Sequence, residues 1–448
     1  MTAAKPSSLP VVPVPASANG YVTPRSAGDG IDYELFLDCV HCGLCTSACP
    51  TYVELGDEND GPRGRIYLMR GVTDGRIPLD KAVTRHLELC LDCRACESAC
   101  PSGVQYSKLI EPFRINMRKS GASTEKLGML QRFLLYNVTP YASRMRLALA
   151  PARLMQWTGI DGLLSRLGVF RVLPRSLRNL HDMVPPLGRA RARLPEILPA
   201  EGTRRARVAF FTGCAGDAFF PETTLNTARV LQKNGVEVWT PPAQVCCGAL
   251  HYHAAHEEPA KEFARKNIDL FLSQDIDAVI VNAAGCGAMI KDYGHILGDD
   301  RAKALAKKSL DVSEFLMNLG PVKPTHPLKL KATYHDACHL CHGQQIRSQP
   351  RQLLGMIPEL QMVPLPESEI CCGAAGSYNL TEPEMAERLG QRKAGNLLAT
   401  GADAVFSSNV GCLIQIGRYL REKKPDVWIG HVVDALWASY SGETPKGI

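Results

Sequence analysis

The chain has 448 residues, of which 45% are hydrophobic and 21% charged, a composition typical of folded globular proteins. It excludes a disordered chain and a disulfide-stabilised miniprotein. The 51 lysines and arginines exceed the 45 acidic residues by too little to indicate nucleic-acid binding, and no apolar run reaches the roughly 18 residues of a membrane span.

The first residues, MTAAKPSSLPVVPVPASANG, contain prolines that interrupt every apolar stretch. A secretory signal peptide needs a continuous apolar segment, so we expect none here and predict a cytoplasmic location. We expect residues 1–30 and 441–448 to form flexible tails.

Cysteine is the most informative residue type. The chain has 17 cysteines, an odd number that argues against a closed set of disulfides. Eight of them form two runs with the same spacing, C-x2-C-x2-C-x3-C-P. The first run is Cys39, Cys42, Cys45, Cys49 and Pro50, and the second is Cys90, Cys93, Cys96, Cys100 and Pro101.

This spacing is typical of two-cluster ferredoxins, in which three cysteines of a run bind one 4Fe-4S cluster and the fourth binds the other. We therefore predict a two-cluster domain at residues 31–112, with a helix beginning after the fourth cysteine of each run. Zinc would leave the third thiol of each run without a role, and neither run has the C-x-x-C-H of haem attachment. The predicted ligands are Cys39, Cys42, Cys45 and Cys100 for the first cluster, and Cys49, Cys90, Cys93 and Cys96 for the second.

The stretch between the two runs predicts a short helix that begins near Pro62. Arg63, Arg65 and Arg70 in this stretch either offset the negative charge of thiolate-bound clusters or are ordinary solvated helix charges.

A strongly basic segment follows. Between Phe113 and Arg193, 15 lysines and arginines stand against three acidic residues. Apolar residues recur at helical spacing in KLGMLQRFLLYNV and GIDGLLSRLGVFRVL, so we predict a basic helical linker at residues 113–203. Such a face suits an anionic membrane surface or an acidic protein partner, although a solvated linker is the alternative. Its few aromatic residues fit the apolar stripe and do not indicate nucleic-acid binding.

The remaining nine cysteines reveal an internal duplication. Equivalent cysteines of the two copies lie 124 to 126 residues apart, and each copy contains C-C-G, as the numbering of the sequence shows. We predict one domain at residues 204–325 and a second at 326–440. The paired cysteines are Cys214, Cys246, Cys247 and Cys286 in the first copy, and Cys338, Cys371, Cys372 and Cys412 in the second, where Cys341 is an additional cysteine.

Each copy alternates strands such as RVAFFTGC with helices such as PETTLNTARVLQKNG, which predicts a parallel sheet. The cysteines follow strands, so we expect them to gather at the carboxyl edge of each sheet. Buried inert thiols are the alternative interpretation. The overall prediction is an α+β protein with a helical ferredoxin-like domain, a basic helical linker and a duplicated α/β half.

The phrases CVHCGLCTSACPTYVELGDENDGPRGRIYLMRG and CLDCRACESACPSGVQY, followed by two C-C-G copies, resemble the iron-sulfur subunit of bacterial glycolate oxidase. The resemblance runs from Asp38 to Trp437. It implies an oxidoreductase subunit with no catalytic residue of its own, which receives electrons from FAD-containing subunits that oxidise glycolate to glyoxylate. The electrons would pass to a quinone or another acceptor, with this chain in the cytoplasm or peripheral on the cytoplasmic face of the inner membrane.

The C-C-G copies resemble those of heterodisulfide reductase, in which the last cysteine belongs to a C-x2-C pair and five thiolates hold a noncubane cluster. Here the partner positions are Ala283 and Asn409, which departs from that pattern, and Cys341 offers another fifth thiolate. We hypothesise a further metal or iron-sulfur centre at these motifs. His335, His339 and His342 surround Cys338 in the sequence and could bind metal or relay protons.

Two other functions remain open. One is electron transfer in a lactate or glycerol-3-phosphate dehydrogenase complex. The other is an iron-sulfur sensor or scaffold protein. The chain lacks dinucleotide-binding, P-loop and nucleophile-elbow motifs, which favours electron transfer over substrate chemistry of its own.

Overall fold

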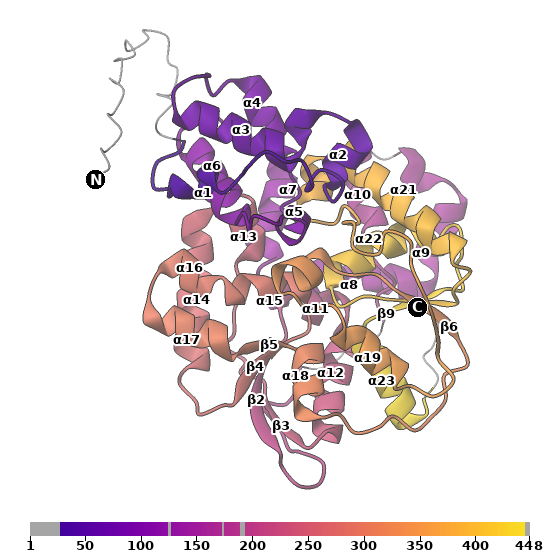
Figure 1. The fold of residues 1–448 in the computed structure, drawn as a ribbon. Helices are drawn as coiled ribbons and strands as arrows, with labels where there is room; N and C mark the ends of the chain where they lie inside the picture. The colour runs from indigo at the N-terminus through magenta and orange to yellow at the C-terminus, as the bar shows by residue number, and fades with distance from the viewer. Residues whose placement is uncertain (1–26, 124–126, 173, 189–192, 444–448) are drawn as a thin grey trace.

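The structure is a computed structural model that describes residues 27–123, 127–172, 174–188 and 193–443. A helical N-terminal domain lies on top of two α/β repeats (Figure 1). Most of both expected tails lies outside the described residues, as do Lys126, Arg189 and Arg191 of the basic segment.

The N-terminal domain consists of short helices around a small apolar core. Phe36, Met69, Leu109 and Phe113 are fully buried in it. The helix expected near Pro62 is present, and this proline occupies its first turn, where no backbone N–H is needed. The elements are α1 (Glu34–Leu37), α2 (Pro50–Leu55), η2 (Glu58–Asp60), α3 (Pro62–Thr73), α4 (Lys81–Glu88), α5 (Ala95–Ser98) and α6 (Ser107–Lys119).

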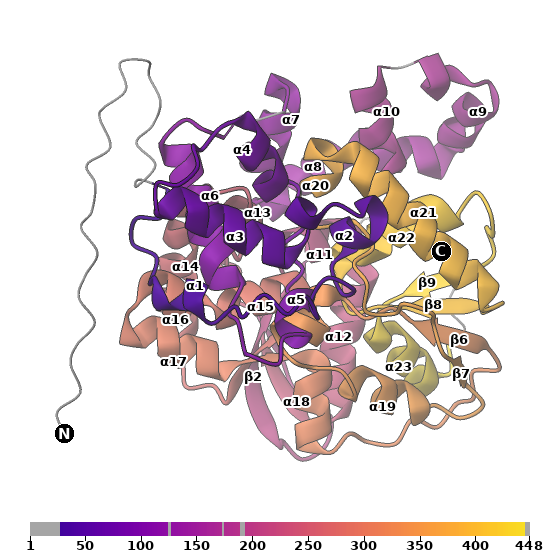
Figure 2. The same cartoon turned by 45° about the horizontal axis from the view of Figure 1, so that its top comes forward.

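The linker is helical, as expected from its periodicity. Its longest helix is α8 (Ala142–Thr158), which lies inside the predicted helical segment and contains Pro151. Figure 2 shows α9 and α10 on the outside of the molecule, beside the second repeat. The other elements are α7 (Met129–Phe133), the π-helical turn η3 (Leu134–Val138), α9 (Ile160–Arg166), η4 (Val169–Val172) and α10 (Arg175–Asp182).

The first repeat is a five-stranded sheet in the order β1-β3-β2-β4-β5, with β1 antiparallel to β3 and the other neighbours parallel. Its strands are β1 (Ile197–Leu198), β2 (Ala206–Phe211), β3 (Val236–Trp239), β4 (Ala278–Val281) and β5 (Ser309–Asp311). Its helices are α11 (Cys214–Phe219), α12 (Pro221–Lys233), α13 (Ala249–His253), α14 (Glu257–Phe271), α15 (Ala284–Lys291), α16 (Tyr293–Leu297), α17 (Asp300–Lys308) and α18 (Val312–Leu319).

The second repeat has four parallel strands in the order β7-β6-β8-β9, which reproduces the order β3-β2-β4-β5 of the first. Its strands are β6 (Lys331–Tyr334), β7 (Gln361–Val363), β8 (Ala404–Phe406) and β9 (Trp428–Gly430). Its helical elements are the π-helical turn η5 (His339–Gly343), α19 (Gln349–Gly355), α20 (Tyr378–Thr381), α21 (Pro383–Ala399), α22 (Val410–Leu420) and α23 (Val432–Ser441). The duplication and the parallel sheets are therefore confirmed.

The two repeats share one apolar core. Val208 and Val230 of the first repeat belong to the same buried cluster as Phe406 and Val433 of the second. The two repeats therefore pack directly against each other, and the second repeat also contacts the N-terminal domain.

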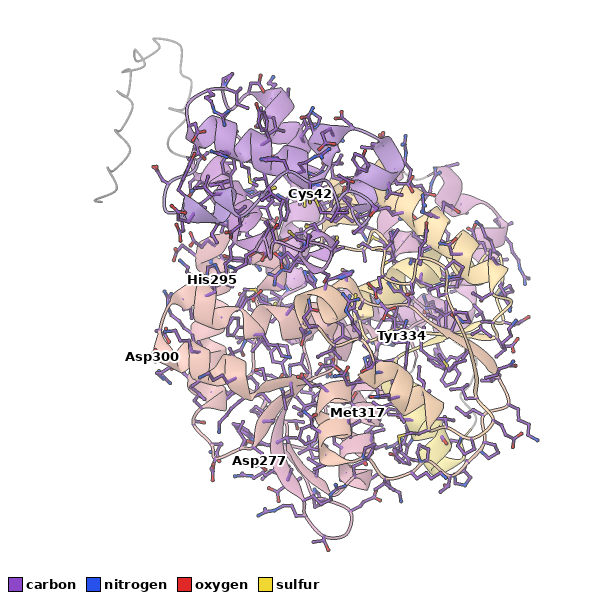
Figure 3. All side chains as sticks on the ribbon, viewed as in Figure 1. Cys42, Asp277, His295, Asp300, Met317 and Tyr334 are labelled. Carbon is purple, nitrogen blue, oxygen red and sulfur yellow. The ribbon has the colours of Figure 1, made fainter. Side chains whose placement is uncertain are left out.

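The sheets present their carboxyl edges toward the N-terminal domain. Asp277, which precedes β4, lies at the end of the molecule far from Cys42, which belongs to the N-terminal domain (Figure 3). Loops that leave the strand ends therefore reach the cysteines of the N-terminal domain. Among the residues that the structure describes, no helix is both long and apolar enough to cross a membrane.

Candidate metal centres

The cysteines predicted to hold the first cluster line one cavity. This cavity is bounded by the loop of the first run, by Arg63 and by the end of the second run. Gly43 in the loop has a φ of +83°, a left-handed conformation that glycine adopts without strain. The lining cysteines are Cys39, Cys42, Cys45 and Cys100, together with Cys96.

The cysteines predicted to hold the second cluster line a separate, more buried cavity. Arg65 and Tyr106 also border it. Its cysteines are Cys49, Cys90, Cys93 and Cys96. Each cavity thus combines cysteines from both runs in the crossed pattern that the spacing predicts, and the assignment of individual ligands stays a prediction.

The thiols in these cavities suit a cationic group. Burial, together with the charges of Cys39 and Cys100, raises the pKa of Cys45 to about 11. Burial likewise raises the pKa of Cys93 and Cys96 well above the usual value, and neighbouring cysteines raise it further. Thiols that raise one another's pKa lose their protons readily only to a metal, so the donor set fits iron-sulfur clusters.

The three arginines between the runs have different surroundings. Arg65 is 1% exposed, and its Nη1 atom lies 3.9 Å from the sulfur of Cys49. Arg63 lines the first cavity, where it donates to the carbonyl of His41. Arg70 instead contacts Tyr33 and Asp74 at the surface. Glu58 pairs with Arg63 through both carboxylate oxygens, so Arg65 is the better candidate for charge compensation, and Arg70 is an ordinary helix charge.

The fourth cysteines differ from each other in local structure. Cys49 is the N-cap of α2, as expected. Cys100 is followed by a turn in which Gly103 has a φ of +69°, and the next helix, α6, begins at Ser107. The prediction of a helix directly after Cys100 is wrong, because Pro101, Ser102 and Gly103 form a turn instead.

In the first repeat, four cysteines gather beyond the strand ends, as expected. The sulfurs of Cys214 and Cys246 lie 3.7 Å apart. Hydrogen bonding continues from Cys246 to Cys247 and from Cys247 to Cys286, so the thiols form a chain.

The second repeat has the same chain of thiols, Cys338, Cys371, Cys372 and Cys412. Where the fuller motif has another cysteine, Asn409 donates from Nδ2 to the sulfur of Cys412 over 3.3 Å. Cys341 is buried, and its sulfur lies 3.8 Å from the carbonyl oxygen of Cys338.

The three histidines near Cys338 point to different partners. His335 shares a possible metal-binding group with Cys372 and Cys412, with ligand atoms within 4.8 Å of one another. His339 stacks on His253 of the first repeat, with ring centroids 5.2 Å apart. His342 contacts Ser98 and the carbonyl of Glu369. The sequence could not separate these roles, because their spacing places all three beside Cys338.

The C-x-x-C-H spacing of haem attachment does occur outside the two runs, at Cys338, Cys341 and His342. All three side chains are buried. Cys338 forms a hydrogen bond with the thiol of Cys371, and His342 forms one with the hydroxyl of Ser98. These contacts place Cys338 in the thiol chain and His342 against the N-terminal domain.

A buried charged network joins the N-terminal domain to the first repeat. His253 Nδ1 lies 3.1 Å from Asp92, and Arg94 lies 3.0 Å from Glu111 and 2.6 Å from Asp292. Burial would raise the pKa of Asp92, but His253 and Arg94 hold it below its usual value. Sequence analysis did not find this network, since its members share no motif or spacing.

The second cluster cavity adjoins the second repeat. Cys93 belongs to the same buried cluster as Cys338 and Cys371. Tyr378 of the second repeat donates its hydroxyl to the carbonyl of Leu89, 2.7 Å away, at this contact. The two sets of cysteines are therefore in contact across the domain boundary.

These features define an iron-sulfur electron-transfer protein with a two-cluster domain and a duplicated cysteine-rich domain. The family models agree: a 4Fe-4S dicluster domain matches residues 36–104, and a cysteine-rich domain matches residues 208–291 and 332–417. A third model, described as the linker region of the glycolate oxidase iron-sulfur subunit, matches residues 126–184.

Relatives extend over most of the chain. It is 39% identical over 392 residues to the probable glycolate oxidase iron-sulfur subunit of Bacillus subtilis, covering 85% of this chain and 88% of that protein. It is 33% identical over 393 residues to the glycolate oxidase iron-sulfur subunit of Escherichia coli, covering 84% and 88%. Lactate utilization protein A of Shouchella clausii is 31% identical over 51% of this chain and 98% of that protein. The chain belongs to the glycolate oxidase iron-sulfur subunit family.

Proposed function

We propose that this chain carries electrons from FAD-containing partner subunits, which oxidise glycolate to glyoxylate, toward a quinone or another acceptor. The strongest support for this proposal is the pair of adjacent cysteine-lined cavities. Cys96 lines both of them. Bound 4Fe-4S clusters supply one-electron redox chemistry. In the proposed domains 31–112, 204–325 and 326–440, the cysteines bind the metal centres that carry electrons and set the distances between them.

The first cavity is the proposed entry point for electrons. Cys42 is exposed, whereas Cys90, Cys93 and Cys96 of the second cavity are buried. Val40 lines the first cavity and is 68% exposed, and Tyr67, whose ring centroid lies 6.1 Å from that of the cavity-lining His41, is 55% exposed. Apolar side chains at the surface beside a redox centre suit a protein partner, because that partner excludes water from the contact.

The substrate is tested on the complex purified anaerobically with its partner subunits. We expect glycolate to reduce an artificial dye through the complex faster than lactate or glycerol-3-phosphate does. The relative named for lactate utilization makes lactate the second candidate, and faster reduction by lactate would replace the glycolate assignment.

The entry point is tested with Tyr67→Glu, which places a charge on the proposed partner surface. We expect slower glycolate-dependent reduction of the clusters at unchanged iron content. Val322→Glu is the control, because Val322 is also exposed but lies outside the N-terminal domain. Equal rates in the two variants would contradict the assignment of this surface.

We further propose that the linker contacts an anionic membrane surface. Met129, Leu147 and Trp157 are each at least 75% exposed, and the segment that carries them is strongly basic. Apolar side chains together with basic charge are the combination that binds anionic lipid surfaces.

Vesicle flotation of the full chain tests this contact. We expect binding to vesicles that contain phosphatidylglycerol, little binding to pure phosphatidylcholine, and loss of binding in Trp157→Glu but not in Val322→Glu. Absence of flotation, combined with loss of partner subunits in Trp157→Glu, would assign the surface to a protein contact instead.

A further inference from the structure

The two repeats differ at one fully buried position beside their cysteines. In the first repeat, Phe211 ends β2 three residues before Cys214. In the second repeat, His335 follows β6 three residues before Cys338. Phe211 is 1% exposed and His335 is 0% exposed. The second repeat therefore has a buried imidazole where the first repeat has a buried apolar ring.

The imidazole of His335 lacks the full set of partners that a buried polar ring needs. Neither ring nitrogen reaches a well-formed hydrogen bond among the described residues, and the backbone of Ser368 offers the ring only a weak one. Leaving such a group unsatisfied costs on the order of 1–3 kcal/mol, so a buried unpaired histidine requires an explanation. The backbone N–H of His335 donates to the carbonyl of Phe406 over 2.9 Å, which fixes the residue at the strand end.

The thiols of Cys372 and Cys412 face this ring. The ligand atoms of all three residues lie within 4.8 Å of one another, and all three side chains are buried. Cys371 hydrogen bonds to Cys372, so further sulfur is close to the same point. Two thiols and an unprotonated imidazole are the donors that tetrahedral zinc or iron sites use.

The surroundings favour charged thiolates. Lys393 is 3% exposed, and the cysteines whose charges act on it are Cys371, Cys372 and Cys412. Asn409 donates to the sulfur of Cys412. A buried ammonium group and an amide donor both stabilise negative sulfur, as the neighbours of metal ligands commonly do.

We propose that the second repeat binds a first-row transition metal through a ring nitrogen of His335 and the thiolates of Cys372 and Cys412, with a neighbouring thiolate of the same chain as fourth ligand. Binding replaces the thiol protons, which leave to solvent, and gives the imidazole a strong partner in place of its weak contact with the backbone of Ser368. The first repeat has phenylalanine at this position, so it offers sulfur ligands alone. This deepens the further centre hypothesised at the C-C-G motifs, and it makes the two repeats chemically different.

The test uses the full chain purified anaerobically. Iron, zinc and inorganic sulfide are measured per chain, and X-ray absorption is recorded at the iron and zinc edges. Two cubane clusters account for about eight irons. We expect metal in excess of these eight irons, and imidazole scattering in the spectrum of the excess metal. The absorption edge at which this imidazole scattering is found shows whether the excess metal is iron or zinc.

The variant His335→Phe copies the first repeat at this position. We expect it to lose one metal equivalent and the imidazole scattering while the two ferredoxin-type clusters keep their electron paramagnetic resonance signals. The control is His339→Phe, because His339 is also buried near Cys338 but stacks on His253. We expect this control to keep the metal.

The proposal is overturned if the wild-type protein holds no metal beyond the two clusters, if the excess metal has only sulfur ligands, or if His335→Phe keeps its full content and spectrum. The wild-type spectrum decides the question even if a variant does not fold. About eight irons with intact cluster signals and no further metal would remove this site and leave the proposed electron-transfer function standing.

Discussion

Arg94 of the N-terminal domain lies 2.6 Å from Asp292 of the first repeat, and its side chain is 8% exposed. The same Nη2 atom lies 3.0 Å from Glu111. One buried guanidinium therefore serves two carboxylates, one from each side of the domain boundary. Arg94 directly follows the cluster ligand predicted at Cys93, so the contact also fixes the second cavity against the repeats.

Replacing Arg94 by methionine removes the guanidinium that pairs with the buried Glu111 and with Asp292 across the domain boundary. Removing one partner of a buried ion pair costs roughly 3–5 kcal/mol, so we expect a lower denaturation midpoint and faster proteolysis at the domain boundary. Chemical denaturation followed by gel analysis of limited digests measures both.

The control for Arg94 is the exposed pair of Arg301 and Asp269, whose side chains are 62% and 65% exposed. Exposed pairs contribute little, so Arg301→Met should leave the midpoint nearly unchanged. Equal shifts in both variants would show that the network does not join the domains.

Cys100→Ser tests the crossed assignment of ligands. Cys100 belongs to the second run but lines the cavity of the first. We expect loss of the first cluster, a fall from about eight to about four irons, and survival of the second cluster's paramagnetic signal. Cys341→Ser is the matched control, because this buried cysteine lies outside both cavities and should leave the two signals unchanged. Loss of the second cluster in Cys100→Ser would refute the crossing.

Much of the site could be predicted because its information is local or repeated. The spacing of the two runs reports ligand geometry directly, and the constant offset between Cys214 and Cys338 reports the duplication. Parallel pairing then follows from the alternation of strands and helices, whereas the strand order and the antiparallel strand β1 were not predicted.

What could not be predicted depends on tertiary contacts. His335, His339 and His342 have similar sequence surroundings, and only packing directs the first to thiols, the second to His253 and the third to Ser98. Arg94 and Asp292 lie far apart in the chain and carry no pattern that connects them.

The lowered pKa of His431 leads us to predict that the stability of the fold depends on pH. Burial lowers its pKa to about 4, and its Nδ1 atom accepts a hydrogen bond from the backbone N–H of Val433 at the start of α23. The ring is neutral in the folded chain, whereas the unfolded chain takes up a proton below a pKa of about 6.5. Stability from this group is therefore lost as pH falls from about 6.5 to 4, by about 3 kcal/mol in total.

The variant His431→Asn keeps an N-cap residue but removes the titrating ring. We expect a smaller loss of stability between pH 7 and pH 5 than in the wild type, whatever the absolute stability at pH 7. Denaturation followed by tryptophan fluorescence at both pH values measures this, since Trp239, Trp428 and Trp437 lie in the repeats. An unchanged difference between the two pH values would contradict a neutral His431.

Arg65 sets the reduction potential of the second cluster in our proposal. Its guanidinium lies 3.9 Å from the sulfur of Cys49, and its side chain is 1% exposed, so solvent screens it little. A positive charge near a centre that gains an electron raises the potential. Arg65→Gln should therefore lower the potential of the second cluster by roughly 50–150 mV.

Redox titration followed by electron paramagnetic resonance measures this shift. The control is Arg70→Gln, at the surface of the same helix, which should leave the potential of the second cluster unchanged. A shift of the first cluster alone would move the assignment of Arg65, and with it that of Cys49, to the other cavity.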